Sequence, residues 1–363
     1  MAYGRIHNFA AGPAVLPESV VEEVRDQLPN LHGTGVGLCE ISHRSKTFQA
    51  VVDSATALMR RVLSLPDDYT VLFLQGGASL QFYMHALNLL RPGEAADFLV
   101  TGTWAKKALK EAKLVGDAAS IWDDAPENYK RVPADGEYTV RDNAVYLHYT
   151  SNNTLFGTEY RRTPDSQGKP LVADLSSDIA GAPLEASKHD LIYAGAQKNL
   201  GPSGLTLVIL SPWALSRVPE RGLPSMLDYR VHAKEGSLYN TPNTFGIFML
   251  ERVLAWMEAS GGLEGAVARN KAKAELLYGE LDRTGYWRPH AQPASRSWMN
   301  VTWRLPTEPL EEQFVKEAKA AGLDGLKGHR SVGGIRASLY NALTLPSVQA
   351  LVDFMRDFES KNG

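Results

Sequence analysis

Uninterrupted apolar runs recur along this chain and predict buried strands. Seven of them have the length of one strand each: residues 69–75, 97–100, 118–122, 144–148, 171–174, 191–194 and 205–210. Apolar side chains at consecutive positions indicate strands that are covered on both faces. Such strands form a mostly parallel sheet between helical layers. We therefore predict an α/β fold whose large domain holds a mostly parallel seven-stranded sheet.

Apolar residues at helical spacing predict the covering layers, and glycines divide the chain. Helices are expected at residues 17–28, 49–65, 80–90, 243–260 and 263–281. Beyond them, strands at 299–303 and 334–340 and helices at 309–321 and 347–359 predict a compact α+β unit. Gly261 and Gly262 interrupt the helical pattern. We place the boundary there, with a large domain at residues 16–260 and a smaller one at 261–363 together with 1–15.

Composition excludes several classes of function. A chain of 363 residues is long enough for two domains and a sizeable active site. A net charge of −3 leaves no broad basic face, so no nucleic-acid partner is expected. The single cysteine, Cys39, precludes a cysteine-cluster metal site and fits a reducing compartment, and the nine histidines show no metal-ligand spacing. We therefore expect no metal. Because the chain has no signal-like or membrane-spanning apolar run, we expect no membrane contact and a cytoplasmic location.

The strongest chemical signal is Lys198, which follows the strand at 191–194 in a glycine-rich turn. A lysine at a strand end ordinarily points into water. Its apolar frame disfavours the charged amine, however, and a neutral amine is what Schiff-base formation requires. Asp174 ends the strand at 171–174, and strand ends of an open α/β sheet share one rim. An acid beside this lysine suggests pyridoxal phosphate, whose ring nitrogen a carboxylate keeps protonated.

Several further residues follow predicted strands and suit a phosphorylated, aromatic cofactor. Gly76 to Ser79 connect a strand to a helix, and the free amides of such a turn favour a phosphate. Without a ligand, the same pattern is simply a tight turn. Trp104 could stack on a ring, or pack beneath a helix. Hydrogen bonds could come from a set of polar residues in loops: Thr154, Ser177, Gln197, Asn240 and Thr241.

Basic residues cluster at three places. His43-Arg44 and His329-Arg330 both lie among serines or glycines, where they are either solvated or suited to recognise a dianion. Arg336 lies inside the apolar strand at 334–340. Because a buried guanidinium needs an anion, a substrate carboxylate would suit it.

These residues belong to motifs that cover the chain nearly from end to end and together are highly specific. They are Asn8 to Pro13, Ser42 to Arg44, Gly76 to Phe82, Tyr193 to Pro202, Tyr239 to Pro242 and Lys327 to Ser338. In them the chain closely resembles the phosphoserine aminotransferases, a class V family of the fold type I pyridoxal phosphate enzymes. The resemblance implies their fold and a homodimer with shared active sites.

The resemblance also implies roles for individual residues. Lys198 and Asp174 would be catalytic, as the Schiff-base lysine and the partner of the pyridine nitrogen, and Trp104 would stack on the ring. Ala78, Ser79 and Gln197 would hold the cofactor phosphate, with Asn240 and Thr241 from a partner subunit, and Thr154 would bond the ring hydroxyl. The substrate phosphate would meet His43, Arg44, His329 and Arg330, the last two from across the interface, and Arg336 would bind the α-carboxylate. One departure is Ser79, where some relatives carry an arginine.

The reaction implied is transamination between glutamate and 3-phosphohydroxypyruvate, giving phosphoserine and 2-oxoglutarate for serine biosynthesis. A related four-carbon substrate of pyridoxine biosynthesis, giving 4-phosphohydroxythreonine, is a second hypothesis.

Other interpretations explain less of the chain. A serine–glyoxylate type aminotransferase would leave both His-Arg pairs without a purpose, and a cysteine desulfurase needs a nucleophilic cysteine later than Cys39. A phosphate-binding module without chemistry would not need Lys198 opposite Asp174. A Rossmann dehydrogenase is disfavoured because no G-x-G-x-x-G pattern with a downstream acid follows an early strand.

Overall fold

A seven-stranded sheet organises the described part of the chain. The computed structural model describes residues 2–219, 222–330 and 332–363. Within these ranges the strand order is β2-β8-β7-β6-β5-β3-β4. The strands are β2 (Thr70–Leu74), β3 (Ala95–Val100), β4 (Asp117–Asp123), β5 (Ala144–Thr150), β6 (Leu171–Asp174), β7 (Leu191–Gly195) and β8 (Thr206–Leu210). β3 to β7 run parallel, and β8 is antiparallel to both neighbours, so the predicted α/β class and mostly parallel sheet are confirmed.

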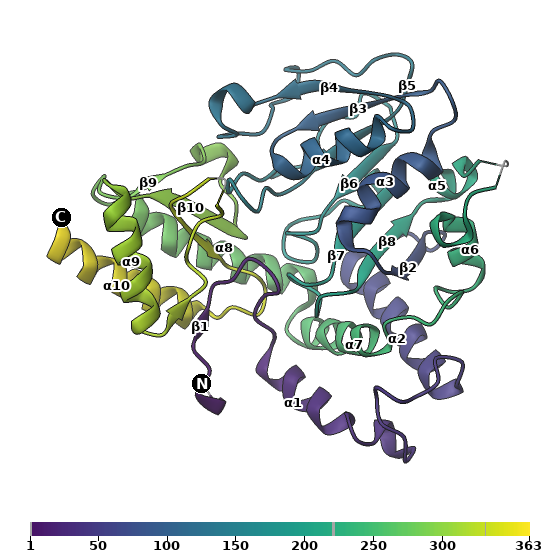
Figure 1. The fold of residues 1–363 in the computed structure, drawn as a ribbon, viewed down its shortest axis with the longest axis horizontal. Helices are drawn as coiled ribbons and strands as arrows, with labels where there is room; N and C mark the ends of the chain where they lie inside the picture. The colour runs from purple at the N-terminus through teal and green to yellow at the C-terminus, as the bar shows by residue number, and fades with distance from the viewer. Residues whose placement is uncertain (1, 220–221, 331) are drawn as a thin grey trace.

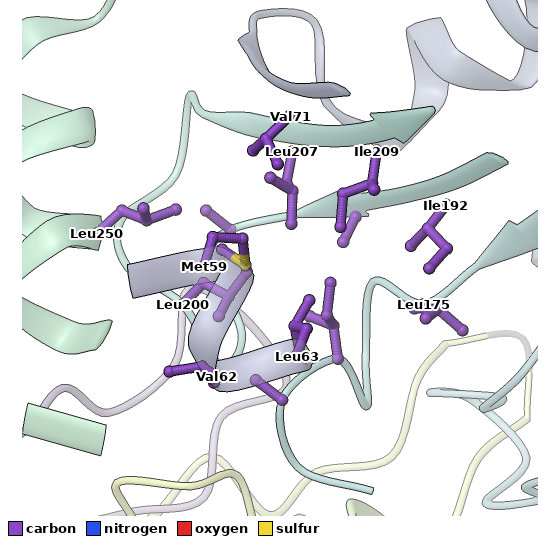
Figure 2. Close-up of a cluster of buried hydrophobic side chains, with 14 of the residues drawn as sticks. Met59, Val62, Leu63, Val71, Leu175, Ile192, Leu200, Leu207, Ile209 and Leu250 are labelled. Atoms are coloured by element: carbon purple, nitrogen blue, oxygen red, sulfur yellow. The ribbon is translucent and has the colours of Figure 1, made fainter. Parts of the chain in front are cut away.

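Three helices cover one face of this sheet: α1 (Glu18–Gln27), α2 (Lys46–Leu63) and α7 (Thr244–Ala259). Figure 2 shows Met59, Val62 and Leu63 of α2 beneath side chains of β2, β7 and β8. Phe248, Leu250 and Leu254 from α7 belong to the same buried cluster. α2 begins at Lys46 rather than at the predicted residue 49, because the Ser45 hydroxyl accepts the Phe48 amide at 3.1 Å and caps the helix.

Four helices cover the opposite face: α3 (Gly77–Leu89), α4 (Thr103–Ala112), α5 (Pro212–Arg217) and α6 (Tyr229–Lys234). The strands contribute alternate residues to the two faces. On β2, Val71 and Phe73 join the first cluster, whereas Leu72 and Leu74 pack with α3 in the second. Because both faces of β2 are covered, its odd-numbered and its even-numbered residues from Val71 to Leu74 are all apolar.

A third buried cluster lies in the C-terminal third of the chain, at the left of Figure 1. It joins the second half of α8 (Gly262–Leu281) to α9 (Glu308–Ala320) and α10 (Leu345–Asn362). Its antiparallel sheet has the order β12 (Ile335–Ser338), β10 (Asn300–Arg304), β9 (Arg288–Pro289). Phe9 also belongs to it, because β1 (His7–Asn8) pairs with β11 (Leu323–Asp324). The domain boundary at Gly261 stays a prediction.

Some elements differ from the sequence prediction. α3 begins at Gly77, three residues earlier than expected, because Gly76 has a φ of +89° and turns the chain directly into the helix. α4, α5 and α6 were not predicted. Short 3-10 turns complete the described elements: Ala2–Gly4, Leu31–Gly33, Ala125–Glu127, Ala186–Lys188, Ser225–Leu227 and Pro293–Ser295.

Candidate active site

A cavity of about 370 Å³ opens at the carboxyl edge of the large sheet. Thr150 and Asp174 end the neighbouring strands β5 and β6, where they are register partners, and both line the cavity. Lys198, three residues beyond β7, lines it as well. The parallel arrangement of β5, β6 and β7 therefore carries three strand ends to one place.

Lys198 is partly buried and makes one specific contact. Its ammonium Nζ donates to the Thr154 hydroxyl at 2.8 Å. Burial lowers the pKa of Lys198 to about 8, and the positive charge of Arg336 lowers it further, against the attraction of Asp174. About a tenth of the amine is thus neutral at pH 7, and the neutral amine is the form that attacks a carbonyl.

Asp174 is buried and faces the same cavity. Its Oδ1 accepts the Ser176 backbone amide at 2.9 Å. Burial raises the pKa of Asp174 above its ordinary value, although the Ser176 bonds and the charge of Lys198 oppose the shift. A cationic group bound beside this carboxylate would relieve the cost of burying its charge.

The first turn of α3 forms another wall. Gly77, Ala78 and Ser79 line the cavity, and no side chain caps the helix start at Gly76. The amides of a helix's first turn have no intrahelical acceptor, so they are available to an anion. The glycine-rich cradle expected between strand and helix is therefore the first turn of the helix itself.

Trp104 lines the cavity from the first turn of α4. It was expected just after a strand, and the chain enters α4 three residues after β3 ends. Its indole Nε1 is buried and has no hydrogen-bond partner in the described chain. On the ring itself, Lys107 Nζ lies 4.6 Å from the centroid.

Arg336 and Thr154 meet at the cavity although 182 residues separate them. The guanidinium donates Nη1–H to the Thr154 carbonyl at 3.3 Å, while its buried Nε finds no partner in the described residues. Burial lowers the pKa of Arg336 from its ordinary value. A buried, incompletely satisfied guanidinium is a site for an anion.

His329 lines the cavity of its own chain. A hairpin places it there: the Gly328 amide donates to the Gly334 carbonyl at 2.8 Å, and the Arg336 amide donates to the Leu326 carbonyl at 2.8 Å. The hairpin leads directly into β12, so His329 stays above the same cavity as Arg336. The expectation that His329 reaches across a dimer interface stays a prediction.

Five other predicted site residues do not line this cavity: His43, Arg44, Arg330, Asn240 and Thr241. Thr241 lies instead against the end of β2, where its carbonyl accepts the Gln75 side chain at 3.2 Å. Arg44 is exposed in the turn before α2. Gln197, in contrast, does line the cavity beside Lys198.

The sequence prediction missed the N-terminal segment as part of the site. Ala11 and Gly12 line the cavity, and the Ala14 amide donates to the Gln197 carbonyl at 2.9 Å. A Cβ on Gly12 would lie 3.3 Å from Cγ of Lys198, which shows how closely the backbone passes. The motif Asn8 to Pro13 was a usable signal, since glycine permits such an approach. Asn152 and Ser176 were also missed, and Ser177 is present as expected.

Comparison with known proteins decides the family. The model of the aminotransferase class-V family matches residues 6–351. The chain belongs to this family. The resemblance inferred from the motifs is thereby confirmed.

Within this family, the chain is similar over its full length to proteins named phosphoserine aminotransferase. A phosphoserine aminotransferase from Herpetosiphon aurantiacus is 48% identical over 359 residues, 99% of both chains. The solved phosphoserine aminotransferase from Bacillus circulans subsp. alkalophilus is 46% identical, with a TM-score of 0.96 and 99% of both chains covered. A pyridoxal-phosphate-bound phosphoserine aminotransferase from Trichomonas vaginalis is 35% identical, with a TM-score of 0.92 over 97% of this chain and 100% of that one.

The described residues contain neither a candidate metal site nor a candidate membrane span. No group of three His, Cys, Asp or Glu side chains there could hold a metal ion. None of the helices in the same part of the chain is long and apolar enough to cross a bilayer.

Proposed function

We propose that this protein is a pyridoxal-phosphate-dependent phosphoserine aminotransferase. It transfers the amino group of glutamate to 3-phosphohydroxypyruvate, giving phosphoserine and 2-oxoglutarate in serine biosynthesis. The observation that carries the proposal is one cavity that holds Lys198, with its pKa lowered to about 8, together with Asp174, Trp104 and Arg336. Relatives of nearly equal length, about half identical, bear the same name.

The residues around the cavity fit the cofactor. Uncapped amides at the start of α3 suit its phosphate, and the buried Asp174 suits a protonated ring nitrogen. Trp104 provides an aromatic face, Thr154 a hydroxyl for the ring substituent, and Gln197 a further polar group. When bound, pyridoxal phosphate supplies an aldehyde that condenses with amines and a ring that takes up the electrons of a broken C–H bond.

Residues of the chain itself hold the cofactor and transfer protons. Lys198 Nζ would hold the cofactor between turnovers, and the amine that the substrate frees would take up the α-proton. Its lowered pKa suits both roles, because the amine exists in both protonation states near neutral pH. The hydroxyl of Thr154, 2.8 Å from Nζ, orients the free amine. Asp174, as a carboxylate, keeps the ring nitrogen protonated.

Substrate recognition rests on the basic groups. Arg336, with its unpartnered Nε, binds the α-carboxylate. His329 at the cavity and the neighbouring Arg330 bind the substrate phosphate. We further propose that His43, Arg44, Asn240 and Thr241 act in a partner's cavity, since none of the four lines the cavity of its own chain or adjoins a residue that does, as Arg330 adjoins His329. The protein is then a homodimer with shared active sites, and we expect it in the cytoplasm.

The discriminating experiment compares phosphoserine with serine as amino donors to 2-oxoglutarate in a coupled assay. Two arginine contacts of about 1.5–3 kcal/mol each predict a preference of roughly 10²–10⁴-fold for phosphoserine. Arg44→Ala and Arg330→Ala each lose a large part of it. Equal turnover of both donors would overturn the proposed substrate. Retention of wild-type kcat/KM by either variant would overturn the assignment of the phosphate site.

The four-carbon phosphorylated substrate of pyridoxine biosynthesis is a second candidate. A substrate with one more backbone carbon still carries the phosphate and the carboxylate that the basic groups recognise. The same assay with 4-phosphohydroxythreonine tests it, and no turnover would exclude that role.

A further inference from the structure

Lys107 on α4 is a cation at the cavity that neither the motifs nor the roles proposed above account for. Its Nζ lies 4.6 Å from the centroid of the Trp104 ring, and Trp104 lines the cavity. The Lys107 side chain is exposed and does not itself line the cavity. The ammonium thus lies on the Trp104 ring but outside the cavity lining, a position that we call the cavity mouth.

Positive charges converge on this mouth from two separate parts of the chain. Arg336, Arg330 and Lys107 all lie near enough to His329 for their charges, after burial, to lower the pKa of its imidazole. Among the described residues, neither Lys107 nor Arg336 forms an ion pair. The chain as a whole carries a net charge of −3, so this excess of cations is local.

We propose that Lys107 is a substrate-binding residue, which holds the phosphate of the substrate at the cavity mouth together with His329 and Arg330. The inference rests on the proposed function and extends its phosphate site by a residue on α4. Arg336 lies deeper, against Thr154, and takes the carboxylate end. A substrate anchored there extends toward the mouth, where a dianion meets Lys107. A long, flexible lysine side chain reaches it from the Trp104 ring, where its ammonium lies.

The experiment uses the holoenzyme and compares Lys107→Met with Lys106→Met as the matched control. Both lysines are exposed on α4, but consecutive helical residues point about 100° apart, so Lys106 faces elsewhere. Methionine keeps an unbranched apolar side chain at this position and removes the charge. We expect Lys107→Met to raise KM for phosphoserine about five- to twentyfold with kcat nearly unchanged, because one partly solvated charged contact is lost. Lys107→Arg should restore most of the affinity.

A second readout separates substrate contact from support of Trp104. Reaction with serine, which lacks the phosphate, should be the same in Lys107→Met and wild type. The inhibition constant for inorganic phosphate should rise in Lys107→Met and stay unchanged in Lys106→Met. If phosphoserine and serine are affected equally, Lys107 acts through the indole and the inference is wrong. It is also wrong if phosphoserine kinetics and phosphate inhibition both stay within twofold of wild type.

The two proposals fail in different ways. A wild-type enzyme that does not prefer phosphoserine over serine would overturn the proposed function. Inorganic phosphate inhibition then still decides whether Lys107 belongs to an anion site.

Discussion

Burial changes the chemistry of two lysines in this chain, with different consequences. Lys198 meets a hydroxyl in a cavity, whereas Lys273 on α8 is enclosed and donates to three backbone carbonyls. Burial lowers the pKa of Lys198 to about 8 and that of Lys273 to about 7. An amine beside a cavity can react, but one saturated by carbonyls can only hold the backbone. Surroundings, rather than residue type, separate a reactive lysine from a structural one.

The lowered pKa of Lys198 predicts how cofactor capture depends on pH. The neutral amine attacks the aldehyde, so capture by cofactor-free protein should rise about tenfold per pH unit below pH 8 and level off above it. The rate is measured from the visible absorbance that follows addition of pyridoxal phosphate. N-acetyl-lysinamide is the control, because its unperturbed amine should keep accelerating to about pH 10. A protein profile that also rises to pH 10 would contradict the shift.

Lys273 predicts a loss of stability upon Lys273→Met. The carbonyls of Leu339, Tyr340 and Leu343 lose their donor, at 2.6, 2.7 and 3.0 Å. Leaving them buried and unpaired should lower the free energy of unfolding by about 2–5 kcal/mol. Chemical denaturation of the variant and the wild type measures the difference.

The same substitution has a predicted pH dependence. The unfolded lysine binds a proton up to about pH 10.4, whereas the folded one releases it above about pH 7. Between these values unfolding takes up a proton, so the wild type gains stability as the pH rises. Methionine binds no proton, so the variant does not gain stability in this way. The loss upon Lys273→Met should therefore be larger at pH 9 than at pH 6, and an equal loss at both would refute the shift.

At the scale of elements, the N-terminal segment links the C-terminal sheet to the cavity. β1 pairs with β11, the Phe9 carbonyl accepts the Ser338 amide at 3.1 Å, and the Ala11 carbonyl accepts the Tyr340 hydroxyl at 3.1 Å. These bonds hold Ala11 and Gly12 at the cavity wall. The segment has no core of its own, so its position depends on the elements that it touches.

Gly325→Ala tests this dependence. A Cβ there would meet the Ala10 backbone nitrogen at 2.5 Å, and the φ of +83° is itself unfavourable for alanine. We expect a loss of about 1–3 kcal/mol in stability and a weaker affinity for pyridoxal phosphate, because Ala11 and Gly12 move. The control is Gly279→Ala in α8, where no atom lies within 4 Å and alanine should stabilise by about 0.5–1 kcal/mol. Unchanged cofactor affinity in Gly325→Ala would show that the segment does not shape the site.

Element prediction from the sequence succeeded where apolar patterns were long. The seven strands of the large sheet were all anticipated. Six of them are buried along nearly their whole length and are mainly apolar, whereas the edge strand β4 is partly exposed. The sequence did not predict α4, because its buried side consists mainly of Ala105, Ala108 and Ala112, which give a weak hydrophobic periodicity. α5 and α6 have six residues each, too few for periodicity to stand out.

At the scale of the whole molecule, the proposed homodimer with shared active sites predicts complementation between inactive chains. Lys198→Ala removes the reactive amine of its own chain's cavity, whereas under this proposal Arg44→Ala removes a group that acts in the partner's cavity. Each variant alone should be nearly inactive toward phosphoserine. Unfolding and refolding an equal mixture should restore roughly a quarter of wild-type activity, because half of the dimers are mixed and each has one intact site.

Two measurements control this experiment. Sedimentation must show a dimer for both variants and for the mixture. Lys198→Ala mixed with Asp174→Ala should recover nothing, because both changes lie in the same chain's cavity. Recovery no greater than the sum of the separate variants would mean that Arg44 serves its own chain.

The sequence alone determined which reactive side chains lie at the ends of strands or within them. Asp174 and Lys198 were expected at one rim because parallel strands end at the same edge, and both line the cavity. Arg336 was singled out because a charge inside an apolar strand needs a partner. These inferences depend on local pattern and on the geometry that every parallel sheet shares.

Only the tertiary structure decided which distant segments complete the site. Thr154 meets Arg336 across 182 residues, the N-terminal Gly12 passes beside Lys198, and His329 turns back over its own cavity. Such contacts depend on how the C-terminal sheet packs against the strand ends, and side-chain patterns along the chain carry no information on that packing. Burial, which lowers the pKa of Lys198, likewise arises only when these segments close around it.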